Sequence, residues 1–278
     1  MIKKALCALP LALALVSTTS TAKAPEDILD ELAAKSKSPY LTQSPQNRMM
    51  MPDNPAYDIA AEGEQLFKQK RGPKNASLEQ CDFGKGPGVL KGAYVELPRY
   101  FSDTGKVMDF ESRLVYCMKT LQGYTDNDPQ IRQRHGNTDI MKLTTYIAMQ
   151  SNGMPWNPPM NHPLEKAMRD AGEELFYRRA GPMDFNCATC HTNPSGTRIR
   201  ASVLPNIKIP EEWTKAISWP AYRVGHEAVR SSQHRVLECL WQMRYPNLKP
   251  DSDVNIALIS FWTDRARGQP AILPDMKR

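Results

Sequence analysis

The chain has 278 residues, of which 41% are hydrophobic and 24% are charged, and its formal net charge is +6. This balance is typical of a globular protein with one large or two small cores, and it excludes collagen, a coiled coil and an integral membrane bundle. The basic residues form no run, so we expect no nucleic-acid partner. With 23 prolines against 15 glycines and few aromatic residues, the composition favours compact helices joined by ordered loops, and we predict an all-α fold.

The first 22 residues have the pattern of an export signal. Lys3 and Lys4 precede an apolar stretch at 5–16, and small residues at 20–22 are typical of a cleavage site. The apolar stretch is too short to span a bilayer, and no later window approaches the roughly 18 uncharged apolar residues that a membrane span needs, so we expect no membrane anchor. The sequence therefore predicts a signal peptide at 1–22 and an exported chain that begins with an N-terminal extension at 23–55.

The remaining sequence repeats itself, which predicts two tandem domains of one kind. The repeat has three parts: residues 60–73 align with 169–182, 113–117 with 235–239, and 139–149 with 253–263 as a closing helix. Proline-rich residues 152–163 are typical of a connector. We place the first domain at 56–153 and the second at 154–278.

Helical periodicity supports this organisation. Apolar residues at i, i+4, i+7 and i+11 are expected to trace a buried helix face in each of two segments. These residues are Phe110, Leu114, Cys117 and Leu121 in the first domain, and Leu164, Met168, Ala171 and Leu175 in the second. The helix that carries Cys117, and by the repeat the helix that carries Cys239, should turn its cysteine inward.

The second domain contains Cys187-Ala188-Thr189-Cys190-His191, the C-x-x-C-H pattern of covalent haem attachment. Two thiols on one helical turn can reach the two vinyl groups, and the next residue can ligate the iron. A zinc site would need a second ligand pair, and a redox-active cysteine pair would need a βαβ context, and the sequence predicts neither. We predict haem c attached to Cys187 and Cys190, with His191 as an iron ligand.

The first domain retains only part of such a site. Whichever way Cys81 is aligned with the haem motif, one thiol and the iron-ligating histidine are absent. We therefore predict that the first domain has no haem. Cys81 and Cys117 would then face one pocket from opposite walls, and in an oxidising compartment a disulfide between them is expected, the alternative being two buried free thiols.

Four side chains compete for the position opposite His191 on the iron: Cys239, Met243, His226 and His234. Methionine is usual in electron carriers, but in the first domain the counterpart of Met243 is a leucine. The histidines align with a threonine and a serine. The counterpart of Cys239 is Cys117, so we predict Cys239 as the second ligand and keep Met243 as the alternative.

Together these features resemble the SoxA family, the catalytic cytochrome subunits of the bacterial thiosulfate-oxidising (Sox) system. Residues 235–246 are the specific part of the resemblance, because C-x-x-C-H occurs in every c-type cytochrome. Family members carry two haems or one, and the incomplete site at Cys81 indicates the single-haem type. The resemblance implies that Cys239 ligates the haem and carries a persulfide, and that Arg235 helps to bind substrate.

The activity implied by the resemblance is that of a periplasmic L-cysteine S-thiosulfotransferase. It would join thiosulfate oxidatively to a cysteine of the carrier protein SoxYZ and pass electrons through haem to the cytochrome SoxX. Arg235 lies one helical turn before Cys239, so its guanidinium can approach an anion at that sulfur, although a structural ion pair would also explain it. The alternatives are a thiosulfate dehydrogenase that forms tetrathionate, and an electron-transfer cytochrome with His191 and Met243 as ligands.

Overall fold

The structure is a computed structural model, and it describes residues 54–193, 196–199 and 202–277. The predicted signal peptide at 1–22 and nearly all of the extension at 23–55 lie outside these residues. None of the described helices is long and apolar enough to cross a membrane.

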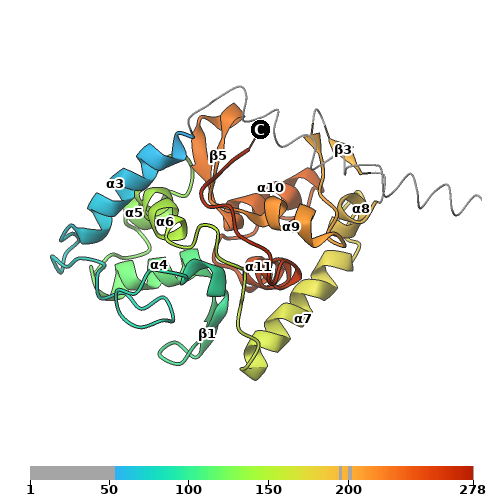
Figure 1. Cartoon of the computed structure of the whole chain (residues 1–278). Coiled ribbons are helices and arrows are strands. Elements are labelled where there is room, and N and C mark those ends of the chain that lie inside the picture. Colours follow the sequence, from blue (N-terminus) through green and yellow to red (C-terminus); the bar gives the residue numbers. More distant parts are fainter. Residues whose placement is uncertain (1–53, 194–195, 200–201, 278) are drawn as a thin grey trace, which may run out of the picture. The chain divides into compact units, whose positions relative to one another are not determined.

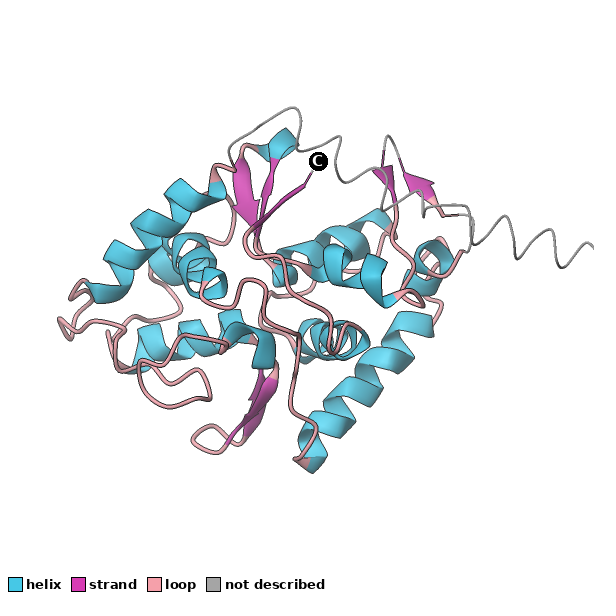
Figure 2. Cartoon of the chain, viewed as in Figure 1, coloured by secondary structure: helices cyan, strands magenta, loops and turns pink. Residues whose placement is uncertain are grey.

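Helices are the main regular elements of the described chain (Figures 1 and 2). The α-helices are α3 (Ala56–Lys68), α4 (Phe110–Thr120), α5 (Pro129–Arg132), α6 (Asp139–Met149), α7 (Pro163–Tyr177), α8 (Cys187–His191), α9 (Pro210–Ile217), α10 (Ser232–Gln242) and α11 (Asp253–Arg265). Two short 3₁₀ turns are η1 (Tyr94–Glu96) and η2 (Val224–His226).

The prediction of an all-α fold needs a correction, because the helices are accompanied by three small sheets. The strands are β1 (Arg99–Phe101), β2 (Lys106–Met108), β3 (Arg198–Ile199), β4 (Ser202–Val203), β5 (Ala221–Arg223), β6 (Ala228–Arg230) and β7 (Asp275–Lys277). Strands β1 and β2 pair antiparallel, as do β3 and β4, and the third sheet has the order β6-β5-β7. Strands of two or three residues are too short to give a periodic signal in the sequence.

Two helix pairs have the same construction. Helix α3 packs against α6, and α7 packs against α11, each at a glycine (Figure 1). A β-carbon at Gly63 would lie 2.0 Å from the carbonyl oxygen of Lys142, and one at Gly172 would lie 1.9 Å from that of Ala257. Both glycines therefore let two helix backbones approach more closely than any other residue would allow.

An aromatic pair lies one turn beyond the glycine in each case. The ring centroids of Phe67 and Tyr146 are 5.9 Å apart, and those of Phe176 and Phe261 are 5.3 Å apart. These spacings are within the range of favourable aromatic contacts. The segments that repeat in the sequence thus adopt matching helix contacts.

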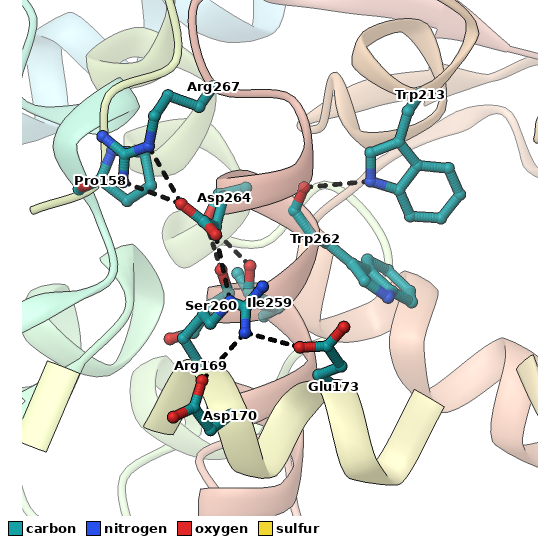
Figure 3. A network of polar contacts seen from close by, with 11 residues as sticks. Pro158, Arg169, Asp170, Glu173, Trp213, Ile259, Ser260, Trp262, Asp264 and Arg267 are labelled. Atoms are coloured by element: carbon teal, nitrogen blue, oxygen red, sulfur yellow. Dashed lines mark hydrogen bonds and ion pairs between the residues drawn. The ribbon is translucent and has the colours of Figure 1, made fainter. Parts of the chain in front are cut away.

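Polar contacts also join α7 to α11 (Figure 3). Arg169 donates to Asp264 at 3.1 Å and also pairs with Glu173 on its own helix. Arg267 bonds the same Asp264 and the carbonyl oxygen of Pro158 in the connector. This network fixes the connector against the end of α11.

The predicted buried face of α4 is confirmed at three of its four residues, the fourth, Leu121, being partly buried just after the helix, but that of α7 is wrong. Phe110, Leu114 and Cys117 are each less than 5% exposed. On α7, Leu164 is 46% exposed, and the buried residues are Glu165, Gly172 and Phe176. The close approach at Gly172 turns an adjacent side of α7 toward α11, so the apolar stripe that begins at Leu164 lines an open groove instead.

A buried hydrogen-bond network connects the helices that carry Cys117 and Cys239. Asp109 caps α4 by accepting from the backbone N–H of Ser112 at 3.0 Å, and Ser231 caps α10 in the same way through His234. The side chain of Gln233 in α10 donates to Asp109 at 2.8 and 2.9 Å. The first turns of the two helices are therefore held together.

Candidate active site

The C-x-x-C-H motif forms the short helix α8. The side chain of Asn186 accepts from the backbone N–H of Thr189 at 2.7 Å, and the Thr189 hydroxyl returns a contact to the Asn186 backbone, so a capping box starts the helix. Cys187 and Cys190 therefore lie on one turn, and both are free thiols. Burial raises the pKa of the Cys187 thiol to about 12, so this group is protonated before any haem is attached.

His191 is held in the tautomer that suits a metal ligand. Its Nδ1 lies 2.9 Å from the backbone carbonyl oxygen of Pro205, which can only accept, so Nδ1 carries the proton. Burial lowers the pKa of His191 to about 4, which keeps the ring neutral. The lone pair on Nε2 is then available, as in other metal-binding histidines whose second nitrogen bonds a carbonyl.

His191 and Cys239 line the same cavity. This cavity is open to solvent. Its apolar walls include Trp213, Trp219, Trp262, Ile217, Val203 and Leu204. A neutral imidazole, a cysteine sulfur and apolar walls beside two attachment thiols fit a haem c.

The other candidates for the second iron ligand do not line this cavity in the described chain. Met243 directly follows α10 as its C-cap residue, is 7% exposed and belongs to the hydrophobic core. His226 and His234 contact the carboxylate of Glu238 instead, at 3.7 and 3.3 Å. Of the four predicted candidates, the structure brings only Cys239 to the cavity that His191 lines.

Arg235 lines the cavity one helical turn before Cys239 and contacts a carboxylate on its own helix. Its Nη1 donates to Oε2 of Glu238 at 3.1 Å. Burial alone would raise the pKa of Glu238, but the hydrogen bond with His234 and the charges of Arg235 and Arg223 lower this pKa to about 2. Glu238 is therefore ionised and holds the guanidinium in place.

Sequence reasoning considered the histidines one at a time and missed their grouping. Ligand atoms of His226, His234 and Glu238 lie within 4.8 Å of one another, a spacing that could hold a metal ion. Arg235 also bonds Glu238, and Arg230 Nε donates to His226 Nδ1 at 3.2 Å. These arginines occupy the ligand atoms and make the surroundings positive, which disfavours a cation.

The cavity also contains residues that the sequence analysis did not consider. Lys215, Arg223, Asp275 and Lys277 lie in its wall. The last two are on β7, which follows Cys239 by more than thirty residues and has no motif of its own. Their position depends on the pairing of β7 with β5, which no local pattern indicates.

In the first half of the chain, the predicted disulfide between Cys81 and Cys117 is confirmed. The S–S distance is 1.97 Å, and the two residues are 1% and 3% exposed. The alternative of two free thiols is therefore wrong. Arg113, the counterpart of Arg235, bonds both oxygens of Asp103 at 2.8 and 2.9 Å and the backbone oxygen of Asp82 at 2.7 Å.

Comparison with known proteins first defines the class. Residues 62–156 match the family model described as the SoxA/TsdA cytochrome c domain. Together with the helical fold and the C-x-x-C-H helix, this match identifies a cytochrome c-type protein, which implies haem c as the cofactor.

Longer alignments with individual proteins then define the family. The chain is 44% identical over 229 residues to the L-cysteine S-thiosulfotransferase subunit SoxA of Hydrogenophilus thermoluteolus. This alignment covers 81% of this chain and 83% of that protein. It is 33% identical over 222 residues to a SoxA of Hydrogenobacter thermophilus, covering 80% and 82%. The chain belongs to the SoxA family of L-cysteine S-thiosulfotransferase subunits.

A solved structure agrees with this assignment. The crystal structure of SoxXA from P. pantotrophus is similar with a TM-score of 0.67 and 25% sequence identity, and the match covers 82% of this chain and 80% of that chain. The mostly helical fold with small sheets is thus a SoxXA-like fold.

Proposed function

We propose that this chain conjugates thiosulfate oxidatively to a cysteine of the carrier protein SoxYZ, giving a cysteine S-thiosulfonate, and passes the electrons to the cytochrome SoxX. The observation that carries the proposal is that Arg235 and Cys239, one turn apart on α10, line the same cavity as His191. The family assignment and the SoxXA structure of P. pantotrophus support the reaction and the partner.

Within this proposal the chain holds a single haem c. Cys187 and Cys190 form the thioether bonds, and His191 and Cys239 ligate the iron. The haem, when bound, accepts electrons one at a time. Residues 154–278 are the haem domain, and residues 56–153 are a related domain in which the disulfide replaces the haem.

Arg235 and Cys239 have separate tasks in the reaction. Arg235, oriented by Glu238, binds sulfonate oxygens of thiosulfate, because a planar guanidinium can donate two parallel hydrogen bonds to an oxyanion. The terminal sulfur of thiosulfate then points at the sulfur of Cys239, which carries a persulfide as the family resemblance implies. Binding of the anion and formation of sulfur–sulfur bonds thus occur on one face of α10.

The overall step balances. Thiosulfate and the carrier thiol give a carrier S-thiosulfonate, one proton and two electrons. The new bond joins the carrier sulfur to the terminal sulfur of thiosulfate, and the thiol releases the proton. Two electrons leave but one haem accepts one at a time, so a second cytochrome is needed, and SoxX fits this role.

The reaction takes place in the periplasm after removal of residues 1–22, and no membrane anchor is required. Two alternatives remain to be separated from the proposal. A thiosulfate dehydrogenase would need no carrier protein. An electron carrier with Met243 as ligand would need no reactive sulfur at Cys239, but Met243 lies in the core.

Two variants measured side by side test the proposal. Cys239→Met should retain a six-coordinate haem, since a thioether ligates iron, but lose thiosulfate-dependent reduction of SoxX with SoxYZ by at least about a thousandfold. Met243→Leu should retain both the spectrum and the activity. Full activity in Cys239→Met would disprove the mechanism, and activity of the unmodified chain without SoxYZ would indicate a thiosulfate dehydrogenase.

The haem content is tested separately. A pyridine haemochrome assay should give one haem per chain, because only one attachment motif is complete. Peptide mass spectrometry of the same sample would locate the haem on Cys187 and Cys190 and detect added sulfur on Cys239. Two haems per chain would contradict the proposed haemless domain.

A further inference from the structure

The sheet β6-β5-β7 brings two cations to one place on the cavity wall. Strands β5 and β7 are parallel, and their register pairs Arg223 with Lys277. Both residues line the cavity that His191 and Cys239 also line. The two residues are far apart in the sequence, and the pairing of the strands makes them neighbours.

Lys277 is partly buried, and one of its hydrogen-bond donors has no partner among the described residues. Its side chain is 15% exposed, and Nζ donates to Asp275 Oδ2 at 2.9 Å and to the backbone oxygen of Lys215. The ring centroid of Trp219 is 5.1 Å away. An ammonium group has three donors, so among the described residues one remains for a ligand.

The charges around Lys277 call for an anion. The cavity wall contains four cationic residues, Lys215, Arg223, Arg235 and Lys277, and the only acidic residue among its described residues is Asp275. Burial lowers the pKa of Lys277, the ion pair with Asp275 opposes this shift, and the like charges of Arg235 and Arg223 add to it. Several like charges around one cavity favour an anion there, in addition to the carboxylates of Asp275 and Glu238 that the described residues supply.

The attachment site determines which part of a haem would meet these cations. In haem c the carbons that form thioether bonds lie on one edge of the macrocycle, and the two propionates lie on the other side. The thioether cysteines are on α8, whereas β5 lies on the far side of α9 and α10 from α8 (Figure 1). A haem bonded to Cys187 and Cys190 would therefore direct its propionates toward β5 and β7.

We propose that Lys277 and Arg223 bind the haem propionates, and that Arg235 is thereby left as the cation for substrate. This inference rests on the haem position proposed above. It explains why the cavity wall contains more cationic residues than one small dianion such as thiosulfate needs. It also gives the small sheet a function, which is to hold the outer edge of the cofactor through β5 and β7.

The pairing has a measurable electrostatic consequence. A positive charge beside the haem favours the reduced iron, which has one positive charge fewer, so removal of Lys277 should lower the midpoint potential. The thioether bonds retain the haem in any such variant, so the effect can be measured on a loaded protein. A substrate-binding cation, in contrast, would affect thiosulfate binding and leave the propionates unchanged.

The experiment compares Lys277→Gln, Lys277→Arg and Lys119→Gln in the full haem-loaded chain with SoxX. Lys119 is a matched control, because it is a cation of α4 whose ion pair with Asp126 lies outside the cavity. In Lys277→Gln we expect shifted propionate bending bands in resonance Raman spectra and a more negative midpoint potential, with an unchanged KM for thiosulfate. Lys277→Arg should restore bands and potential, and the control should equal the unmodified chain.

Other outcomes overturn the inference. Unchanged bands and potential in Lys277→Gln would refute it, and a raised KM with unchanged bands would assign Lys277 to the substrate instead. An unmodified chain without haem on Cys187 and Cys190 would refute the haem position as well. The two failures are thus distinguishable, because the first occurs in a protein whose spectrum and haem content are normal.

Discussion

Helices α4 and α10 have the same cap, arginine and cysteine spacing, but the surroundings of their arginine and cysteine differ. Each starts at a side-chain cap, carries an arginine four residues after the cap and a cysteine four residues later. In α4 the side chain of Arg113 is 5% exposed and Cys117 is bonded to Cys81. In α10 the side chain of Arg235 is 25% exposed, and it and Cys239 line a cavity.

The difference lies in what surrounds each arginine. Arg113 donates to Asp103 and to the backbone oxygen of Asp82, and the rings of Phe101 and Tyr116 lie 4.0 and 4.8 Å from its guanidinium. Arg235 has Glu238 as a partner but also faces open space. One helix design therefore serves structure in the first half, and we propose that it serves catalysis in the second.

The largest effect is expected where the halves are most alike, at the two glycine contacts. Alanine normally stabilises a helix relative to glycine, but at Gly63 or Gly172 its β-carbon would overlap a backbone oxygen. We expect Gly63→Ala and Gly172→Ala each to lower the free energy of unfolding by about 3 kcal/mol. Gly225→Ala is the control, because nothing lies near that position. Denaturant unfolding measures all three, and an unchanged midpoint in either helix variant would contradict the shared construction.

The disulfide gives the next effect, and it should be confined to stability. Replacing Cys81 and Cys117 by serine should destabilise the chain by about 2–4 kcal/mol, because the bridge closes a loop in the unfolded state. The haem spectrum should not change, because neither residue lines the cavity that His191 and Cys239 share, where we propose the haem binds. Thermal unfolding with and without reductant measures the effect, and equal midpoints would show that the bridge contributes nothing.

Replacing Arg235 by lysine should affect activity, whereas replacing Arg113 by lysine should affect stability. Arg235→Lys keeps the charge but loses the planar donor set, so kcat/KM for thiosulfate should fall about 10- to 100-fold with little change in stability. Arg113→Lys should instead lower stability by about 1–2 kcal/mol and leave thiosulfate kinetics unchanged. Loss of activity in both variants would mean that Arg113 also influences the site.

The smallest effect should come from a contact that the first half lacks. Arg169 of α7 bonds Asp264, whereas the aligned residue of α3 is the fully buried Ala60. Arg169→Ala should cost about 1 kcal/mol, since the ion pair is only partly buried. Arg178→Ala removes an exposed pair with Glu174 on the same helix and should have no measurable effect. Equal thermal midpoints for both variants would show that the network of Figure 3 adds no stability.

The sequence predicted those features that local patterns determine. Residues 139–149 form α6 as expected, and 253–263 form most of α11. The repeat predicted the disulfide, because aligned cysteines must face equivalent pockets. The family signature and the repeat together selected Cys239, which lies in the cavity wall.

Features that depend on tertiary pairing could not be predicted. The apolar stripe on α7 was assigned to the core because it is periodic, but Gly172 and Phe176 set the real contact. Lys277 reaches the cavity only because β7 pairs with β5. Glu238 holds Arg235 through a contact that resembles an ordinary surface ion pair in the sequence.

The hydrogen bonds from Gln233 to Asp109 make the two halves one cooperative unit. Asp109 is 3% exposed and Gln233 is 1% exposed, so separating the halves would break hydrogen bonds between a buried carboxyl group and a buried amide. Opening the helix that carries the disulfide would therefore also loosen the first turn of the helix that carries Cys239. We therefore expect the disulfide-bonded helix α4 to limit local unfolding of the first turn of α10.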